Sequence, residues 1–150
     1  MTKKEMHLDF LSRLTKIIGV LTMKPELEEK LYEKYPNLYK QRFLSPTQSC
    51  MCWGIDCGDG WFDIIDELSA KLEPLGIEAV QVKQKFGGLR FYVEKGTEEI
   101  QDMIDAAEEK SYTICEACGT SGTVRGIVWI TTLCDNCWNK IEETYVREDK

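Results

Sequence analysis

Four cysteines in the last third of the chain have the spacing of a zinc site. Cys115 and Cys118 form one C-x-x-C pair. Cys134 and Cys137 form a second pair, and 15 residues separate the two. Each pair can hold one edge of a tetrahedral zinc ion, and the insert is long enough for a β-hairpin. A shell of four thiolates leaves no open coordination position, so we expect one structural zinc ion and no metal-activated water.

The elements expected around these cysteines follow the order of a treble-clef zinc finger. Gly119 supplies the positive φ that a turn after the second cysteine needs. Residues 123–124 and 127–131 can form two short strands around Gly126. The second cysteine pair then begins a helix, and its N-terminal dipole favours thiolate charge. The inner face of that helix is apolar and consists of Trp138, Ile141 and Tyr145.

Three more cysteines lie in a glycine-rich segment in the middle of the chain: Cys50, Cys52 and Cys57. Their C-x-C-x4-C spacing lacks an obvious fourth metal ligand. Asp56, Asp59 or the distant His7 could complete a second zinc site. The favoured interpretation is that these cysteines are small apolar side chains in a tight loop.

A β-hairpin over residues 79–95 is the clearest strand signal. Gly87 and Gly88 are expected to supply the positive φ angles of its two-residue turn. Pairing about this turn places six apolar side chains on one face: Val80, Val82, Phe86, Leu89, Phe91 and Val93. The opposite face carries Lys83, Lys85, Arg90 and Tyr92, and Arg125 of the zinc hairpin could extend it. This polar face is either a contact surface for phosphate or an acidic partner, or a solvated face with salt bridges to neighbouring carboxylates.

Helical patterns on both sides of the hairpin indicate an α+β fold class, with a central β-hairpin or small antiparallel sheet and a C-terminal treble-clef zinc finger. Apolar residues recur every three or four positions over 8–21, and Pro25 can open a second helix. Asp59 and Thr97 are the expected caps of two further helices. The expected divisions are an N-terminal helical segment over 1–48, an α+β core over 49–111 and the zinc module over 112–150.

Composition and charge narrow the class of protein. The chain has 150 residues, of which 43% are hydrophobic and 30% charged, as in folded globular domains. Its formal net charge of −7 creates no long-range attraction to nucleic acid or an anionic membrane, so such binding would need a local basic patch. No stretch approaches the roughly 18 apolar residues of a membrane span. The N-terminus lacks the apolar core of a signal peptide, so we expect a cytoplasmic protein with reduced cysteines.

Three longer motifs stand out: CGDGWFDIIDELS at 57–69, QVKQKFGGLRFYV at 81–93, and CEACG followed by WITTLCDNC within 115–137. In these motifs the chain resembles a family of small proteins encoded by bacteriophages and prophages. The resemblance covers about residues 50–138 and leaves residues 1–45 uncovered. It implies a phage accessory role in the host cytoplasm and a zinc finger, and it supplies no catalytic residues.

A binding protein without catalytic activity is the function that these residues favour. The expected partner is a protein, and the phage setting suggests an inhibitor of host machinery or defence. The first alternative is a nucleic-acid-binding module that uses the cations of the hairpin face. The second is an enzyme with a pocket beside the CGDGW segment, in which Asp59 or Asp63 is the base and Arg90 clamps an anion. His7 is the only histidine, so no nucleophile–base pair supports that second alternative.

Overall fold

The computed structural model describes Thr2, residues 21–127 and residues 129–148, with side chains described as far as Glu143. The helix expected over residues 8–21 therefore lies outside the described residues, except for Leu21. The described elements combine helices with a three-stranded and a two-stranded sheet, so the expected α+β class is confirmed. No described helix has both the length and the apolar character needed to cross a membrane.

The larger sheet has the strand order β1-β2-β3, with bounds Ile55–Asp56, Glu78–Lys85 and Gly88–Glu94. β2 and β3 form the expected antiparallel hairpin. β1 pairs with β2 in parallel, so the sheet is mixed, and it differs from the small antiparallel sheet expected as the alternative to a hairpin alone. The parallel pairing arises because the chain passes through helix α3 between β1 and β2, as a crossover connection does.

The hairpin turn lies one residue earlier than the Gly-Gly pair suggests. Lys85 pairs with Gly88, so Phe86 and Gly87 are the two turn residues, with φ angles of 53° and 84°. Two positive φ angles define a type I′ turn. Gly88 is required for a different reason, because a Cβ there would lie 2.4 Å from the ring of Tyr112.

One face of the hairpin is buried against helices. Val82, Leu89 and Phe91 are at most 3% exposed and belong to the main core. A β-bulge between Ala79 and Gln81 leaves Val80 only half-buried, which corrects its expected place in the core. Phe86 is 63% exposed, so its assignment to the buried face is also wrong.

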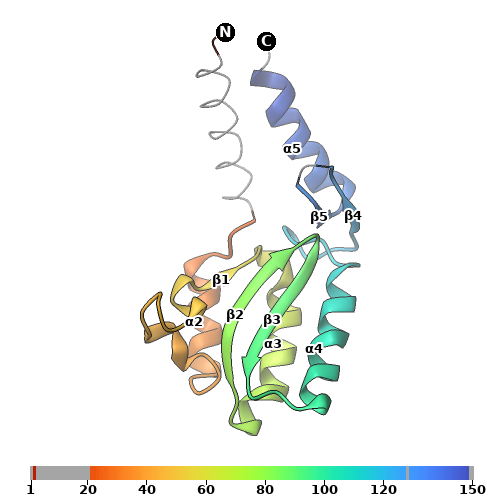
Figure 1. Cartoon of the computed structure of the whole chain (residues 1–150). Coiled ribbons are helices and arrows are strands. Elements are labelled where there is room, and N and C mark those ends of the chain that lie inside the picture. Colours follow the sequence, from red (N-terminus) through yellow and green to blue (C-terminus); the bar gives the residue numbers. More distant parts are fainter. Residues whose placement is uncertain (1, 3–20, 128, 149–150) are drawn as a thin grey trace.

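In Figure 1, helix α3 (Phe62–Leu72) lies behind the hairpin and α4 (Glu98–Ser111) lies beside β3. Apolar side chains of both helices share the main core with those of the hairpin. Thr97 caps α4 as expected, since its hydroxyl accepts a hydrogen bond from the Ile100 N–H. Asp59 does not cap α3, because a 3₁₀ turn over Asp59–Trp61 precedes that helix. The Asp59 carboxylate instead accepts a hydrogen bond from the Lys24 N–H, at 2.8 Å.

Helix α2 (Pro25–Lys34) begins at Pro25, as the sequence predicts. Its Leu31 is fully buried in the main core, together with Tyr39 and Trp61. The hydroxyl groups of Tyr39 and of Ser69 in α3 share a 2.6 Å hydrogen bond. The Tyr39 ring packs edge-on against Phe91. The segment between α2 and the sheet is therefore part of the same core.

The C-terminal module consists of β4 (Thr123–Arg125), β5 (Thr131–Leu133) and α5 (Asp135–Glu148). β4 and β5 pair antiparallel. The second strand thus begins at Thr131, later than the expected residue 127. In Figure 1 this module lies at the turn end of the β2–β3 hairpin, with α5 extending away from the core.

Candidate metal centre

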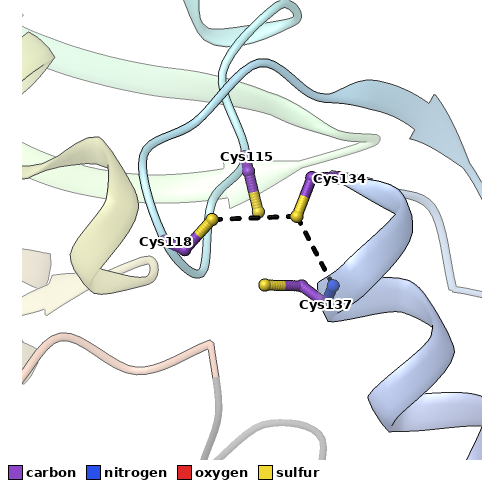
Figure 2. Close-up of side chains that lie close together, drawn as sticks. All are labelled: Cys115, Cys118, Cys134 and Cys137. Atoms are coloured by element: carbon purple, nitrogen blue, oxygen red, sulfur yellow. Dashed lines mark hydrogen bonds between the residues drawn. The ribbon is translucent and has the colours of Figure 1, made fainter.

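The four cysteines of the predicted zinc site come together in one cluster (Figure 2). Their sulfur atoms all lie within 4.8 Å of one another. Cys118 Sγ and Cys134 Sγ are 3.7 Å apart. Zn–S bonds of about 2.3 Å place the sulfurs of a tetrahedral site about 3.8 Å apart, so this pair already has the required separation. The donor set and its geometry fit one four-thiolate zinc ion.

Backbone turns hold each cysteine pair in place. In the first pair, the Cys115 N–H donates to the Thr120 carbonyl and the Gly119 N–H donates to the Cys115 carbonyl. Gly119 has a φ of 80°, as the sequence analysis expects for the turn after the second ligand. In the second pair, the Cys137 N–H points at Cys134 Sγ across 3.4 Å. The first ligands therefore come from a turn and the last ones from the start of α5.

The thiols of the cluster differ in their electrostatic surroundings. The Cys137 N–H stabilises negative charge on Cys134 and lowers its pKa to about 6. The Thr120 hydroxyl lowers the pKa of Cys118 in the same way. Burial raises the pKa of Cys115 and of Cys137. The surroundings of Cys118 and Cys134 thus stabilise a thiolate better than those of Cys115 and Cys137, and any ligand that is still protonated would lose its proton to a bound metal.

The two cysteine pairs and the C-terminal elements together form what we call the metal module, residues 112–148. The buried carboxylate of Glu116 joins this module to the core. Glu116 is 1% exposed and follows the first ligand, Cys115. Its side chain accepts hydrogen bonds from the Gly58 N–H at 3.1 Å and from the Thr131 hydroxyl at 3.0 Å. Its carbonyl accepts a 2.7 Å hydrogen bond from the Gly60 N–H. Burial raises the pKa of the Glu116 carboxyl to about 7, although the hydrogen bonds from Gly58 and Thr131 act to lower it.

The CGDGW segment approaches the first cysteine pair without room for side chains. A Cβ on Gly60 would lie 2.1 Å from the Cys115 carbonyl oxygen, and one on Gly58 would lie 2.4 Å from that of Glu116. The indole N–H of Trp61 donates to the Ile114 carbonyl at 2.9 Å. These glycines are therefore required by close backbone packing. Through them and Trp61, the start of the motif at 57–69 packs directly against the metal module.

The tip of the β2–β3 hairpin makes the second contact with this module. The Thr132 hydroxyl of β5 donates to the Gly87 carbonyl at 2.6 Å. The Gln84 side chain donates to the Ile130 carbonyl at 2.8 Å. The metal module is thus attached to the core at the CGDGW segment and at the hairpin turn.

The other three cysteines do not form a second cluster. Cys50 is exposed, Cys52 is half-buried and Cys57 is buried in the main core, where burial raises the pKa of its thiol. Within the described residues, the four-cysteine cluster is the one group of side chains gathered for a metal, and it includes neither Asp56 nor Asp59. His7 lies outside the described residues.

Four of the candidate anion-binding residues, Lys83, Lys85, Arg90 and Tyr92, share a face of the hairpin by register, whereas Arg125 lies on β4 of the second sheet. Lys83 and Arg90 are cross-strand neighbours, and Tyr92 is 44% exposed. Arg90 makes a salt bridge with Glu108 of α4. Arg125 of β4 makes one with Asp135, at 2.8 Å. The charges of both arginines are therefore already balanced.

Two carboxylates in or just after the CGDGW segment, Asp59 and Glu67, are paired as well. Asp59 lies 3.6 Å from the Lys24 ammonium and Glu67 lies 2.8 Å from that of Lys110. A small pocket of about 100 Å³ opens between α3 and α4, and Glu67, Lys71 and Lys110 line it together with apolar side chains. None of the three residues assigned to the enzyme alternative, Asp59, Asp63 and Arg90, lines this pocket.

Comparison of the chain with family models, with curated proteins and with solved structures finds no match. The interpretation of the site therefore depends on its geometry. Sequence analysis missed Glu116, Thr131 and Thr132, which join the metal module to the core. The available signal was their position: Glu116 lies between two metal ligands, and the threonines lie just before the second cysteine pair.

Proposed function

We propose that the protein is a non-catalytic binding protein whose C-terminal treble clef is held together by one structural zinc ion. The gathering of four cysteine sulfurs within 4.8 Å of one another carries the zinc part of this proposal. Four thiolates complete the coordination of zinc, so the ion would stabilise the module and would not activate water. The buried contacts of Glu116 would pass that stabilisation to the core.

The proposed partner is another protein. The exposed face of the hairpin offers the aromatic ring of Tyr92 and the cation of Lys85 to a partner. Glu108, the carboxylate that reaches this hairpin from α4, is paired with Arg90. The resemblance of the three motifs to phage-encoded proteins suggests an accessory role in the host cytoplasm. Inhibition of host machinery or of a defence system is the role we infer from that setting.

Metal analysis and chelation test the zinc part of this proposal. Mass spectrometry under native conditions should find one zinc ion per chain. Chelation at elevated temperature should expose the amides of residues 112–143 to hydrogen exchange first, because the small apolar cluster around Cys115 cannot hold the module alone. Cys134→Ser should remove the zinc, whereas Cys50→Ser is the matched control and should retain it. A carefully purified protein without zinc would refute the proposal.

Nucleic-acid binding is the second candidate, and the exposed side chains of Lys85 and Tyr92 favour it. Short DNA and RNA strands should then bind with an affinity that falls steeply as salt rises. Neutralisation of Lys83 and Lys85 should abolish the binding. Salt-insensitive or absent binding would leave the protein partner as the account of this face.

A further inference from the structure

An exposed surface at the turn end of the hairpin combines large apolar side chains with two lysines. We call it the tip surface, and it consists of a half-buried lysine, Lys83, and five exposed side chains: Lys85, Phe86, Val124, Ile127 and Trp129. Its apolar members are 63%, 47%, 96% and 41% exposed, in the order Phe86, Val124, Ile127 and Trp129. Large apolar side chains that gather on the surface of a folded protein mark an interaction site.

The two parts of the tip surface are in contact with each other. A Cβ on Gly87 would lie 3.2 Å from Val124 Cγ1, so the hairpin turn touches β4. Lys85 extends over the ring of Phe86, with its ammonium 5.5 Å from the ring centre. Ile127 and Trp129 follow β4 in the connection to β5. Figure 1 shows the hairpin turn beside these two strands. The surface is therefore assembled by docking of the metal module onto the core.

Phe86 is an unfavourable residue for its own position. Its φ of 53° lies in the left-handed region, where a bulky side chain is a genuine outlier. The first position of a type I′ turn strongly prefers asparagine, aspartate or glycine. The ring also gains little from burial, since it is 63% exposed. A residue that costs conformational energy without packing in the core points to a role outside the fold.

The charge of the tip surface limits what it can bind. Within the described residues, Lys83 and Lys85 take part in no salt bridge, whereas Arg90 and Arg125 each have a carboxylate partner. Two available cations are too few to hold a phosphate backbone in a chain of net charge −7. They are enough to pair with one or two carboxylates beside an apolar anchor.

We propose that the tip surface binds an acidic protein segment that carries a large apolar side chain. Carboxylates of the segment pair with Lys83 and Lys85. The apolar side chain packs against Phe86, Ile127 and Trp129. This inference rests on the proposed function and specifies the chemistry of its partner.

Selection from a random peptide library tests this assignment with the zinc-loaded full chain. Peptides of 12 residues are displayed, and the best binder is then measured by fluorescence anisotropy. We expect enrichment of Asp and Glu together with Leu, Phe or Trp. Binding should weaken at least tenfold in the double variant Lys83→Glu/Lys85→Glu and in Ile127→Lys. A selection that yields no binder, or basic peptides, overturns the proposal.

Matched variants separate this surface from the rest of the molecule. Phe86→Asn removes the ring and retains a residue suited to the type I′ turn, so it should weaken binding while the chain stays folded. Lys30→Glu and Leu75→Ala change an exposed lysine and a half-exposed leucine elsewhere, and both should bind as the wild type does. Equal losses in both sets of variants would contradict the assigned surface.

Two other occupants are outcomes of the same experiment. A 12-nucleotide oligo-dT that binds the wild type but not the lysine double variant would assign the surface to nucleic acid. A dimer seen by sedimentation and lost in Ile127→Lys would assign it to a second copy of the chain. Either result overturns the proposal. A chain that holds one zinc ion and its fold but binds no peptide refutes this inference alone, whereas a chain without zinc refutes the proposed function.

Discussion

The carboxylate of Glu116 accepts a hydrogen bond from the backbone N–H of Gly58, a residue 58 positions earlier in the chain. The two residues belong to the two parts of the molecule that the sequence presents as separate, the CGDGW segment and the first cysteine pair. Their hydrogen bond is buried, together with the Thr131 hydroxyl that donates to the same carboxylate. A buried donor that loses its acceptor is costly, so Glu116 couples the metal module to the core.

Truncation of Glu116 is expected to destabilise the zinc-loaded protein. Glu116→Ala leaves the Gly58 N–H and the Thr131 hydroxyl without an acceptor, at a cost of about 1–3 kcal/mol in the free energy of unfolding. Glu116→Gln keeps one acceptor oxygen and should cost less. Urea unfolding followed by circular dichroism measures both. Glu109→Ala changes an exposed glutamate of α4 and should lie within about 0.5 kcal/mol of the wild type. An effect of Glu116→Ala as small as that of the control would contradict the proposed coupling.

Insertion of one methyl group at Gly60 is expected to separate the metal module from the core. The new Cβ would lie 2.1 Å from the Cys115 carbonyl oxygen and 2.5 Å from the Gly119 nitrogen, and both neighbours are backbone atoms that cannot rotate away. Gly60→Ala should therefore cost at least about 2 kcal/mol. It should also speed hydrogen exchange at the amides of Glu116 and Gly119.

The matched control for that substitution is Gly96→Ala. A Cβ on Gly96 would meet the Val93 side chain at 3.1 Å, and a side-chain methyl group can shift. Gly96→Ala should leave the exchange of the Glu116 amide unchanged. If both variants protect that amide as the wild type does, the close approach at Gly60 does not hold the module in place.

The zinc site could be predicted from the sequence because its ligands are local. The two C-x-x-C pairs and the glycine after the first pair are visible in the sequence. The two pairs meet as soon as the 15-residue insert between them forms a hairpin. The position of Glu116 between two ligands could have drawn attention to it, but its contact with Gly58 could not be predicted, because the two residues are distant in the chain. A glutamate beside exposed turn residues ordinarily faces solvent, and only tertiary packing buries this one.

The hairpin shows why a correct element was predicted with the wrong turn. A Gly-Gly pair between alternating residues is a strong hairpin signal, and the hairpin exists. Gly88 is a glycine because the Tyr112 ring lies against it, not because of the turn. A local pattern cannot distinguish a glycine needed for its φ angle from one needed for close approach. Because the turn lies one residue earlier than the Gly-Gly pair suggests, Phe86 is a turn residue with a φ of 53°, although the pattern assigns it to the buried face.

Asp66 is expected to contribute a pH-dependent part of the stability. Partial burial alone would raise the pKa of this carboxyl, but hydrogen bonds from the Lys34 ammonium and the Tyr35 hydroxyl outweigh it and lower the pKa below 3.8. A lowered pKa in the folded state gives a contribution that is fully present above the unfolded value. This contribution is lost as the pH falls through the folded value.

Comparison of the wild type with Asp66→Asn measures that contribution. The variant should be less stable by at most about 1 kcal/mol at pH 7, since the pair is partly solvated. The difference should begin to narrow below about pH 5, roughly one unit above the unfolded pKa. Urea unfolding at pH 7, 5 and 4 gives the profile. Zinc release at low pH affects both proteins and cancels in the difference. A gap that widens on acidification would mean that the pKa of Asp66 is not lowered.

Replacement of Phe86 by asparagine is expected to stabilise the protein. An L-residue with a bulky side chain loses about 1–2 kcal/mol in the left-handed region, and asparagine avoids part of that cost through local hydrogen bonds. The Asn-Gly pair that results is the preferred type I′ turn, so a gain of about 0.5–1 kcal/mol should follow. Thermal unfolding of the zinc-loaded protein measures it. Phe43→Asn, which removes a ring that is 79% exposed outside any left-handed position, should bring no gain. A loss of stability in Phe86→Asn would show that the ring packs against the metal module and serves the fold, and it would remove the argument that the strained phenylalanine is kept for binding.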